Sequence, residues 1–182
     1  MGLTGHNRGP SMVPGSGWHR HCWRTAREAL LPTLPVEVVR LRVKRAADLG
    51  LDYRTYASVR AQTGHDLVAF LFSSNALRAH LLSPAMPPGR AAKLAAVAAA
   101  RHGLAVQPLQ AAVLAAANPQ LDRADPAPWA LAPWAATRQG LRAALAGLPG
   151  DRVLLVGDHP LEAEWCAAGR LAGYLPAERY FG

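Results

Sequence analysis

Two apolar runs constrain the fold of this chain more strongly than any other feature of its sequence. They cover residues 67–72, LVAFLF, and residues 152–156, RVLLV, which is apolar after its first residue. Such runs, without polar alternation, are typical of strands buried on both faces of a parallel sheet. Small polar or acidic residues follow each run, namely Ser73, Ser74 and Asn75 after the first and Gly157, Asp158 and His159 after the second. We therefore expect two adjacent parallel strands in an α/β fold.

The segment at 36–50 admits two interpretations. Val39, Leu41 and Val43 alternate with basic residues, as in a strand, but the segment ends at Gly50, as helices often do. We favour a helix here, followed by a second helix that starts at Asp52 as its N-cap and ends at Gly64.

The rest of the chain supplies one more strand and several helices. We expect the strand at 104–106. Helices are expected after the first apolar run to about residue 82, in the alanine-rich segment that stops at Gly103, before Pro119, up to about residue 148, and at 161–172. This order predicts a small three-stranded parallel sheet, Rossmann-like, with right-handed crossovers and a helical basic N-terminal part. A strand at 36–45 would make the sheet four-stranded.

The first residues differ in composition from the rest. Residues 1–17 are rich in Gly, Pro and Ser, and we expect them to be a disordered lead. Residues 18–182 then form a single α/β domain, with a helix at 18–31, a helical basic part at 18–64 and the sheet core at 65–182. No run approaches the roughly 18 apolar residues of a membrane span, so we expect a cytoplasmic protein.

The side chains at the predicted strand ends suggest a ligand site. Open parallel sheets bind ligands at the carboxyl ends of their strands, where Ser73, Ser74, Asn75, Gly157, Asp158 and His159 would stand, with Gln107 after the strand expected at 104–106. Hydroxyls, amides and helix N-termini favour a phosphorylated or other anionic ligand. The alternative is that Ser, Asn and Asp merely cap the helices that follow.

Two motifs resemble part of the haloacid dehalogenase-like hydrolase pattern. They are FLFSSN at 70–75 and VLLVGDHPLEAEWCAAG at 153–169. The resemblance implies that Ser73 holds a phosphate oxygen and that Asp158, with Glu162, holds Mg²⁺. The chain departs from the pattern because no Asp-x-Asp nucleophile motif follows an upstream strand and the usual lysine is missing, with only Arg138 or Arg142 nearby. Whether the chain is an enzyme is left open.

The basic N-terminal part indicates a different class of function. Residues 1–60 contain ten Arg or Lys against four acidic residues, within a net charge of +8. Residues 36–62 have the spacing of a helix-turn-helix, in which the second helix would read the major groove. This nucleic-acid alternative uses Arg54, Thr55, Ser58 and Arg60 for bases, and Arg40, Arg42, Lys44 and Arg45 for phosphates. A further alternative is a non-catalytic accessory protein whose basic face docks an acidic partner.

Two tryptophans stand beside prolines in the segment 126–134. We expect Trp129 and Trp134 to anchor packing rather than to form a ligand cage.

Overall fold

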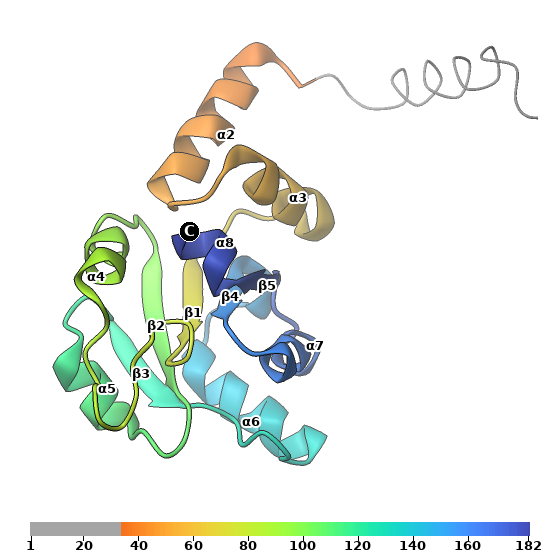
Figure 1. The fold of residues 1–182 in the computed structure, drawn as a ribbon. Helices are drawn as coiled ribbons and strands as arrows, with labels where there is room; N and C mark the ends of the chain where they lie inside the picture. Colours follow the sequence, from red (N-terminus) through yellow and green to blue (C-terminus); the bar gives the residue numbers. More distant parts are fainter. Residues whose placement is uncertain (1–33) are drawn as a thin grey trace, which may run out of the picture. The chain divides into compact units, whose positions relative to one another are not determined.

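The structure is a computed structural model that describes residues 34–182 (Figure 1). The disordered lead predicted at 1–17 and the helix predicted at 18–31 lie outside the described residues. The chain divides into two compact units, Met1–Val39 and Arg40–Gly182. In the first, helix α2 (Val36–Asp48) begins, with the carbonyl of Pro35 accepting hydrogen bonds from the backbone of Val38 and Val39.

A parallel sheet of five strands, in the order β3-β2-β1-β4-β5, forms the centre of the second unit (Figure 1). Its strands are β1 (Ala69–Ser73), β2 (Ala100–Ala105), β3 (Arg123–Pro126), β4 (Val153–Gly157) and β5 (Gly173–Pro176). The two predicted apolar strands are adjacent and parallel, with Ala69 opposite Val153 and Phe72 opposite Val156. The prediction of a parallel α/β sheet is confirmed.

The sheet has two strands more than the three expected. The additional strands, β3 and β5, are its two edges, and most of their residues are only partly buried. Their four-residue segments RADP and GYLP contain a Gly or a Pro, so they lack the apolar run that identifies a central strand. Strand β2 starts four residues before the predicted position, at Ala100, and includes the buried Gly103.

The helices agree with the expectations in part. They are α2, α3 (Tyr53–Thr63), α4 (Pro88–Ala95), α5 (Ala111–Ala117), α6 (Trp134–Leu145), α7 (Glu164–Gly169) and α8 (Ala177–Phe181), with 3-10 turns η1 (Gly150–Arg152) and η2 (Pro160–Ala163). The helical interpretation of 36–48 is confirmed, and a fourth strand at 36–45 is wrong. Asp52 caps α3 and Gly64 ends it in the left-handed conformation, as predicted.

Three predicted helices differ from the structure. The alanine-rich helix expected to stop at Gly103 is the shorter α4, which ends at Ala95, and Gly103 lies in β2. Residues 76–82 form turns, because Arg78 adopts a φ of 54° and His80 pairs with Ser83 in a short bridge. The helix expected at 161–172 is the shorter pair η2 and α7, which ends at Gly169 before β5 begins.

Side chains alternate between the two faces of the central strands, and each face has its own core. Phe70 and Phe72 of β1 point to the face covered by α4, α5 and α8, where Tyr180 packs against both rings. Leu71 and Leu155 point to the opposite face, which α6 and α7 cover (Figure 1). This three-layer arrangement places the carboxyl ends of all five strands at one edge.

Among residues 34–182, no helix has the length and apolar character that crossing a bilayer requires.

Candidate functional site

The site lies where the chain leaves β1 and β4. These neighbouring strands stand at the centre of the sheet order, with β2 and β3 on one side and β5 on the other. Because the connections from β1 and β4 run in opposite directions, the loops after them separate and leave a crevice at this position. The predicted residues at 73–75 and 157–159 therefore come from the two loops that border the crevice.

The loops converge on the carboxylate of Glu162, which lies in η2 and is 3% exposed. Its Oε2 atom accepts hydrogen bonds from Ser73 Oγ at 2.9 Å and from the backbone nitrogens of Asp158 at 2.8 Å and His159 at 3.2 Å. Its Oε1 atom accepts one from Asn75 Nδ2 at 2.9 Å. The donors expected to hold an external anion thus hold a carboxylate of the chain itself.

Ser73 is unsuited to react with a ligand. Its side chain has no exposed surface, and its hydroxyl also accepts a hydrogen bond from the backbone of Ala76 at 3.0 Å. Ser74 lies outside the cluster around Glu162, since its hydroxyl accepts from the backbone of Val106 at 3.1 Å and so joins the ends of β1 and β2. Asn75 lines the smaller of the two pockets described below.

Gly157 allows the carboxylate to approach the end of β4. A Cβ atom at this position would lie 2.5 Å from Glu162 Oε2 and 2.6 Å from Tyr174 Cε2. Burial, together with the carboxylates of Glu162 and Asp158, raises the pKa of Tyr174 to about 12. The Tyr174 hydroxyl is therefore neutral at pH 7 and acts as a donor, to the carbonyl of His159 at 3.4 Å.

Asp158 is not the cap of the helix that follows it. His159 holds that position, because its Nδ1 atom accepts from the backbone of Leu161 at 3.2 Å. With Nδ1 as acceptor, the proton of the neutral ring is on Nε2, which is then a donor. The Asp158 carboxylate is exposed and interacts electrostatically with Arg90.

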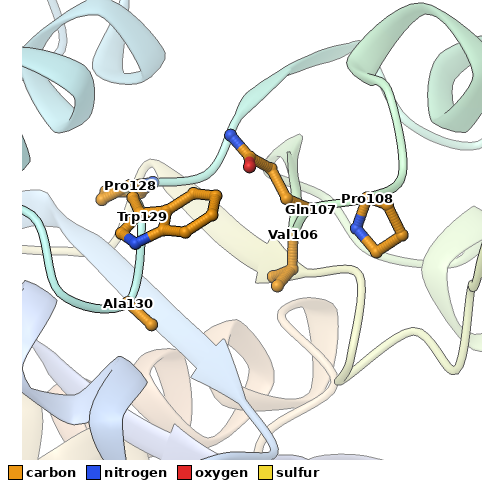
Figure 2. A pocket seen from close by; sticks show the side chains of 6 residues that line it. All are labelled: Val106, Gln107, Pro108, Pro128, Trp129 and Ala130. Carbon is orange, nitrogen blue, oxygen red and sulfur yellow. The ribbon is translucent and has the colours of Figure 1, made fainter.

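Two adjoining pockets form a groove beside the Glu162 cluster. The larger has a volume of about 370 Å³ and lies between the loops after β2 and β3. Figure 2 shows the indole ring of Trp129 extending toward the β2 loop, with Val106 and Gln107 across from it. The smaller, of about 220 Å³, shares Val106, Pro128 and Ala130 with the larger and reaches Asn75, His159, Leu161, Glu162 and Trp165.

The polar groups of the smaller pocket differ in character from those expected. Glu162 is part of its lining, and Oε1 carries one hydrogen bond whereas Oε2 carries three. A carboxylate oxygen accepts more than one hydrogen bond, so Oε1 retains capacity for a donor group of a ligand. The imidazole of His159 and the amide of Asn75 are the other polar groups, and the remaining lining is apolar.

The Mg²⁺ hypothesis rested on Asp158 and Glu162. Within residues 34–182, no group of three or more His, Cys, Asp or Glu side chains is placed to hold a metal ion. Both oxygens of Glu162 already face N–H or O–H donors, which a cation would have to displace.

The residues of the nucleic-acid alternative are divided between surface and interior. Arg45 donates to Asp66 at 2.9 Å and to the carbonyls of Leu67 and Ala98, so it ties α2 to the segments that precede β1 and β2. Thr55 is buried and bonded to Asp52, and Arg60 lies 3.8 Å from Asp66. Arg54, Ser58 and Lys44 remain exposed.

The sequence did not identify the groove. Its lining comes largely from the loops after β2 and after β3, an edge strand that the sequence did not reveal. Trp129 and Trp134 are 58% and 57% exposed, so the prediction that they anchor packing is wrong. The sequence feature that could have indicated the groove is Trp129, which lies between Pro128 and Pro133. Prolines stiffen a surface loop, and a stiff loop can hold a large ring in place.

Comparison of the chain with protein-family models, with curated proteins and with solved structures gives no match. The resemblance to haloacid dehalogenase-like hydrolases therefore stays a prediction.

Proposed function

We propose that this Rossmann-like domain binds a small organic ligand in the groove at the carboxyl edge of its sheet. The observation that supports the proposal is the pair of adjoining pockets of about 370 and 220 Å³ beside the β1 and β4 loops. Ligand pockets are commonly of this size and combine apolar walls with a few polar groups. The ring of Trp129 is suited to pack against a flat apolar group.

The polar end of the groove favours a ligand with an N–H donor. Glu162 Oε1 would accept from that donor, and His159 Nε2 would donate to an acceptor on the same ligand. A phosphate is less well suited to this end, because it would face the Glu162 carboxylate while the donors around Ser73 are occupied. Nitrogen heterocycles and amides carry both a donor and an acceptor on a flat body.

The proposed role is binding rather than hydrolysis. The resemblance to hydrolases implies an attacking Asp, whereas the end of the central strand β1 carries Ser73, Ser74 and Asn75. Ser73 is fully buried and Asn75 is uncharged, so neither supplies the carboxylate of an aspartyl intermediate.

Thermal unfolding in the presence of defined ligand panels tests the proposal. The panels are nucleobases and nucleosides, aromatic amides, and phosphorylated sugars. A ligand present at about 100 times its Kd adds about 2.7 kcal/mol to stability. We expect such a shift with members of the first two panels and its loss in Trp129→Ala, which removes the exposed wall of the larger pocket.

Leu131→Ala is the matched control, because Leu131 is an 84% exposed apolar residue of the same loop and lines neither pocket. It should retain the shift. Stabilisation by phosphorylated sugars alone would show that the anionic ligand expected from the sequence is right and the donor preference wrong. No shift with any panel, or an unchanged shift in Trp129→Ala, would remove the groove as the binding site.

A further inference from the structure

One face of α6 carries an aromatic ring and two arginines in register. Trp134, Arg138 and Arg142 follow one another at intervals of four residues, so their side chains lie on one side of the helix. With Ala135 and Gln139 they line a hollow of about 410 Å³. The opposite side of α6 packs on the sheet through Leu141, Ala144 and Leu145.

The two arginines have no partner in the part of the chain that the structure describes. Neither Arg138 nor Arg142 forms a hydrogen bond or ion pair there, whereas Arg45, Arg101 and Arg123 each pair with an aspartate. No acidic residue occurs between 126 and 150. The electrostatic potential along this face is therefore positive, and no carboxylate of the described residues pairs with the two guanidinium groups.

A partner that offers negative charge alone would account for the arginines but not for the exposed Trp134. Trp134 is 57% exposed at the start of the helix, and tryptophan is enriched at contact surfaces because its large ring joins an apolar body to a polar N–H. Guanidinium groups bind phosphates through paired hydrogen bonds, and an exposed indole stacks on an unpaired base. An acidic peptide would neutralise the arginines but would leave the ring without a flat partner.

We propose that the face of α6 formed by Trp134, Arg138 and Arg142 binds single-stranded nucleic acid. One unpaired base stacks on the indole ring, and phosphates of the neighbouring nucleotides bind the two guanidinium groups. The arginines lie about 6 Å apart along the helix axis, so they contact separate points of an extended strand. This surface is distinct from the groove and from the α2–α3 residues of the helix-turn-helix hypothesis.

Fluorescence anisotropy with a labelled oligothymidylate of about 15 nucleotides, titrated at several salt concentrations, tests the proposal on the full chain. Arg138→Gln/Arg142→Gln should weaken binding and reduce the slope of log affinity against log salt by about 1.4, because each phosphate contact to a single strand contributes about 0.7. Trp134→Ala should weaken binding about tenfold at every salt concentration and leave the slope unchanged. Trp134→Phe keeps an aromatic face and should recover most of that loss.

Arg152→Gln/Arg170→Gln is the charge-matched control, because it removes two exposed arginines that lie outside α6 and outside the residues of the helix-turn-helix hypothesis. It should leave the Trp134-dependent part of the affinity intact. An equal loss in this control and in the α6 double variant would show diffuse electrostatic binding and overturn the assignment. No binding by the wild-type chain, or equal binding of a polyglutamate peptide that is insensitive to Trp134→Ala, would also overturn it.

Discussion

Ser73 and Glu162, 89 residues apart in the sequence, are joined by a buried hydrogen bond of 2.9 Å between Oγ and Oε2. Through this bond the loop after β1 is held against the turn after β4, at the position where the sheet order leaves a crevice. The carboxylate satisfies donors of both loops at once, so it fixes their geometry and shapes the floor of the smaller pocket.

Removing this carboxylate should destabilise the fold. In Glu162→Ala, the buried Ser73 hydroxyl and the amides of Asp158 and His159 lose their acceptor, and we expect a loss of about 3 kcal/mol in the free energy of unfolding. Glu162→Gln keeps one oxygen and should lose about half as much. Urea unfolding at pH 7 measures both values.

Glu164→Ala is the control for this change, since Glu164 is an exposed acid two residues further along the chain. Its unfolding free energy should stay within about 0.5 kcal/mol of the wild-type value. If Glu162→Ala is equally mild, the carboxylate does not organise the loops.

A methyl group at Gly157 should disturb the hydrogen bonds around Glu162. In Gly157→Ala the new Cβ would stand 2.5 Å from Glu162 Oε2, and β4 is buried between its neighbours, so the carboxylate or the Tyr174 ring must move. We expect a cost of about 1–3 kcal/mol, measured by urea unfolding.

Gly140→Ala provides the contrast. Gly140 lies within α6, and a Cβ there would meet only Pro128, at 3.9 Å. Because alanine favours the helix interior, this variant should gain about 0.5–1 kcal/mol. Equal effects of the two substitutions would show that the close contact at Gly157 is not strained.

The central strands were readable from the sequence because burial on both faces leaves only apolar side chains, as in VLLV at 153–156. The edges were not, since one side of an edge strand faces solvent and RADP at 123–126 has no pattern that distinguishes it from a loop. Strand β2 was shifted because Gly103 looks like the end of a helix, whereas in the sheet a Cβ there would lie 2.9 Å from Leu121 Cδ1.

The sequence predicted where the candidate site lies in the fold but not which chemical groups face one another there. Parallel topology alone brings the ends of β1 and β4 together, so the convergence of Ser73, Asn75 and the 157–159 loop followed from the strand prediction. Which group they surround depends on the path of η2, which turns Glu162 inward. The sequence shows which residues can donate or accept hydrogen bonds. Which donor meets which acceptor, 87 to 89 residues away, depends on the tertiary fold.

Stability should decrease in acid partly through Asp66. Burial raises the pKa of this carboxyl, but hydrogen bonds from Tyr56 and Arg45 outweigh burial, and the net pKa lies below the ordinary value. A carboxyl with a lowered pKa in the folded state stabilises the fold above its unfolded pKa of about 3.9, and this contribution is lost as the pH falls through the folded pKa. The stability advantage of the wild-type chain over Asp66→Asn should therefore be present at pH 7 and shrink below about pH 4. Urea unfolding of both proteins between pH 7 and pH 3 checks this, and an advantage independent of pH would show that the Asp66 charge does not stabilise the junction between α2, α3 and β1.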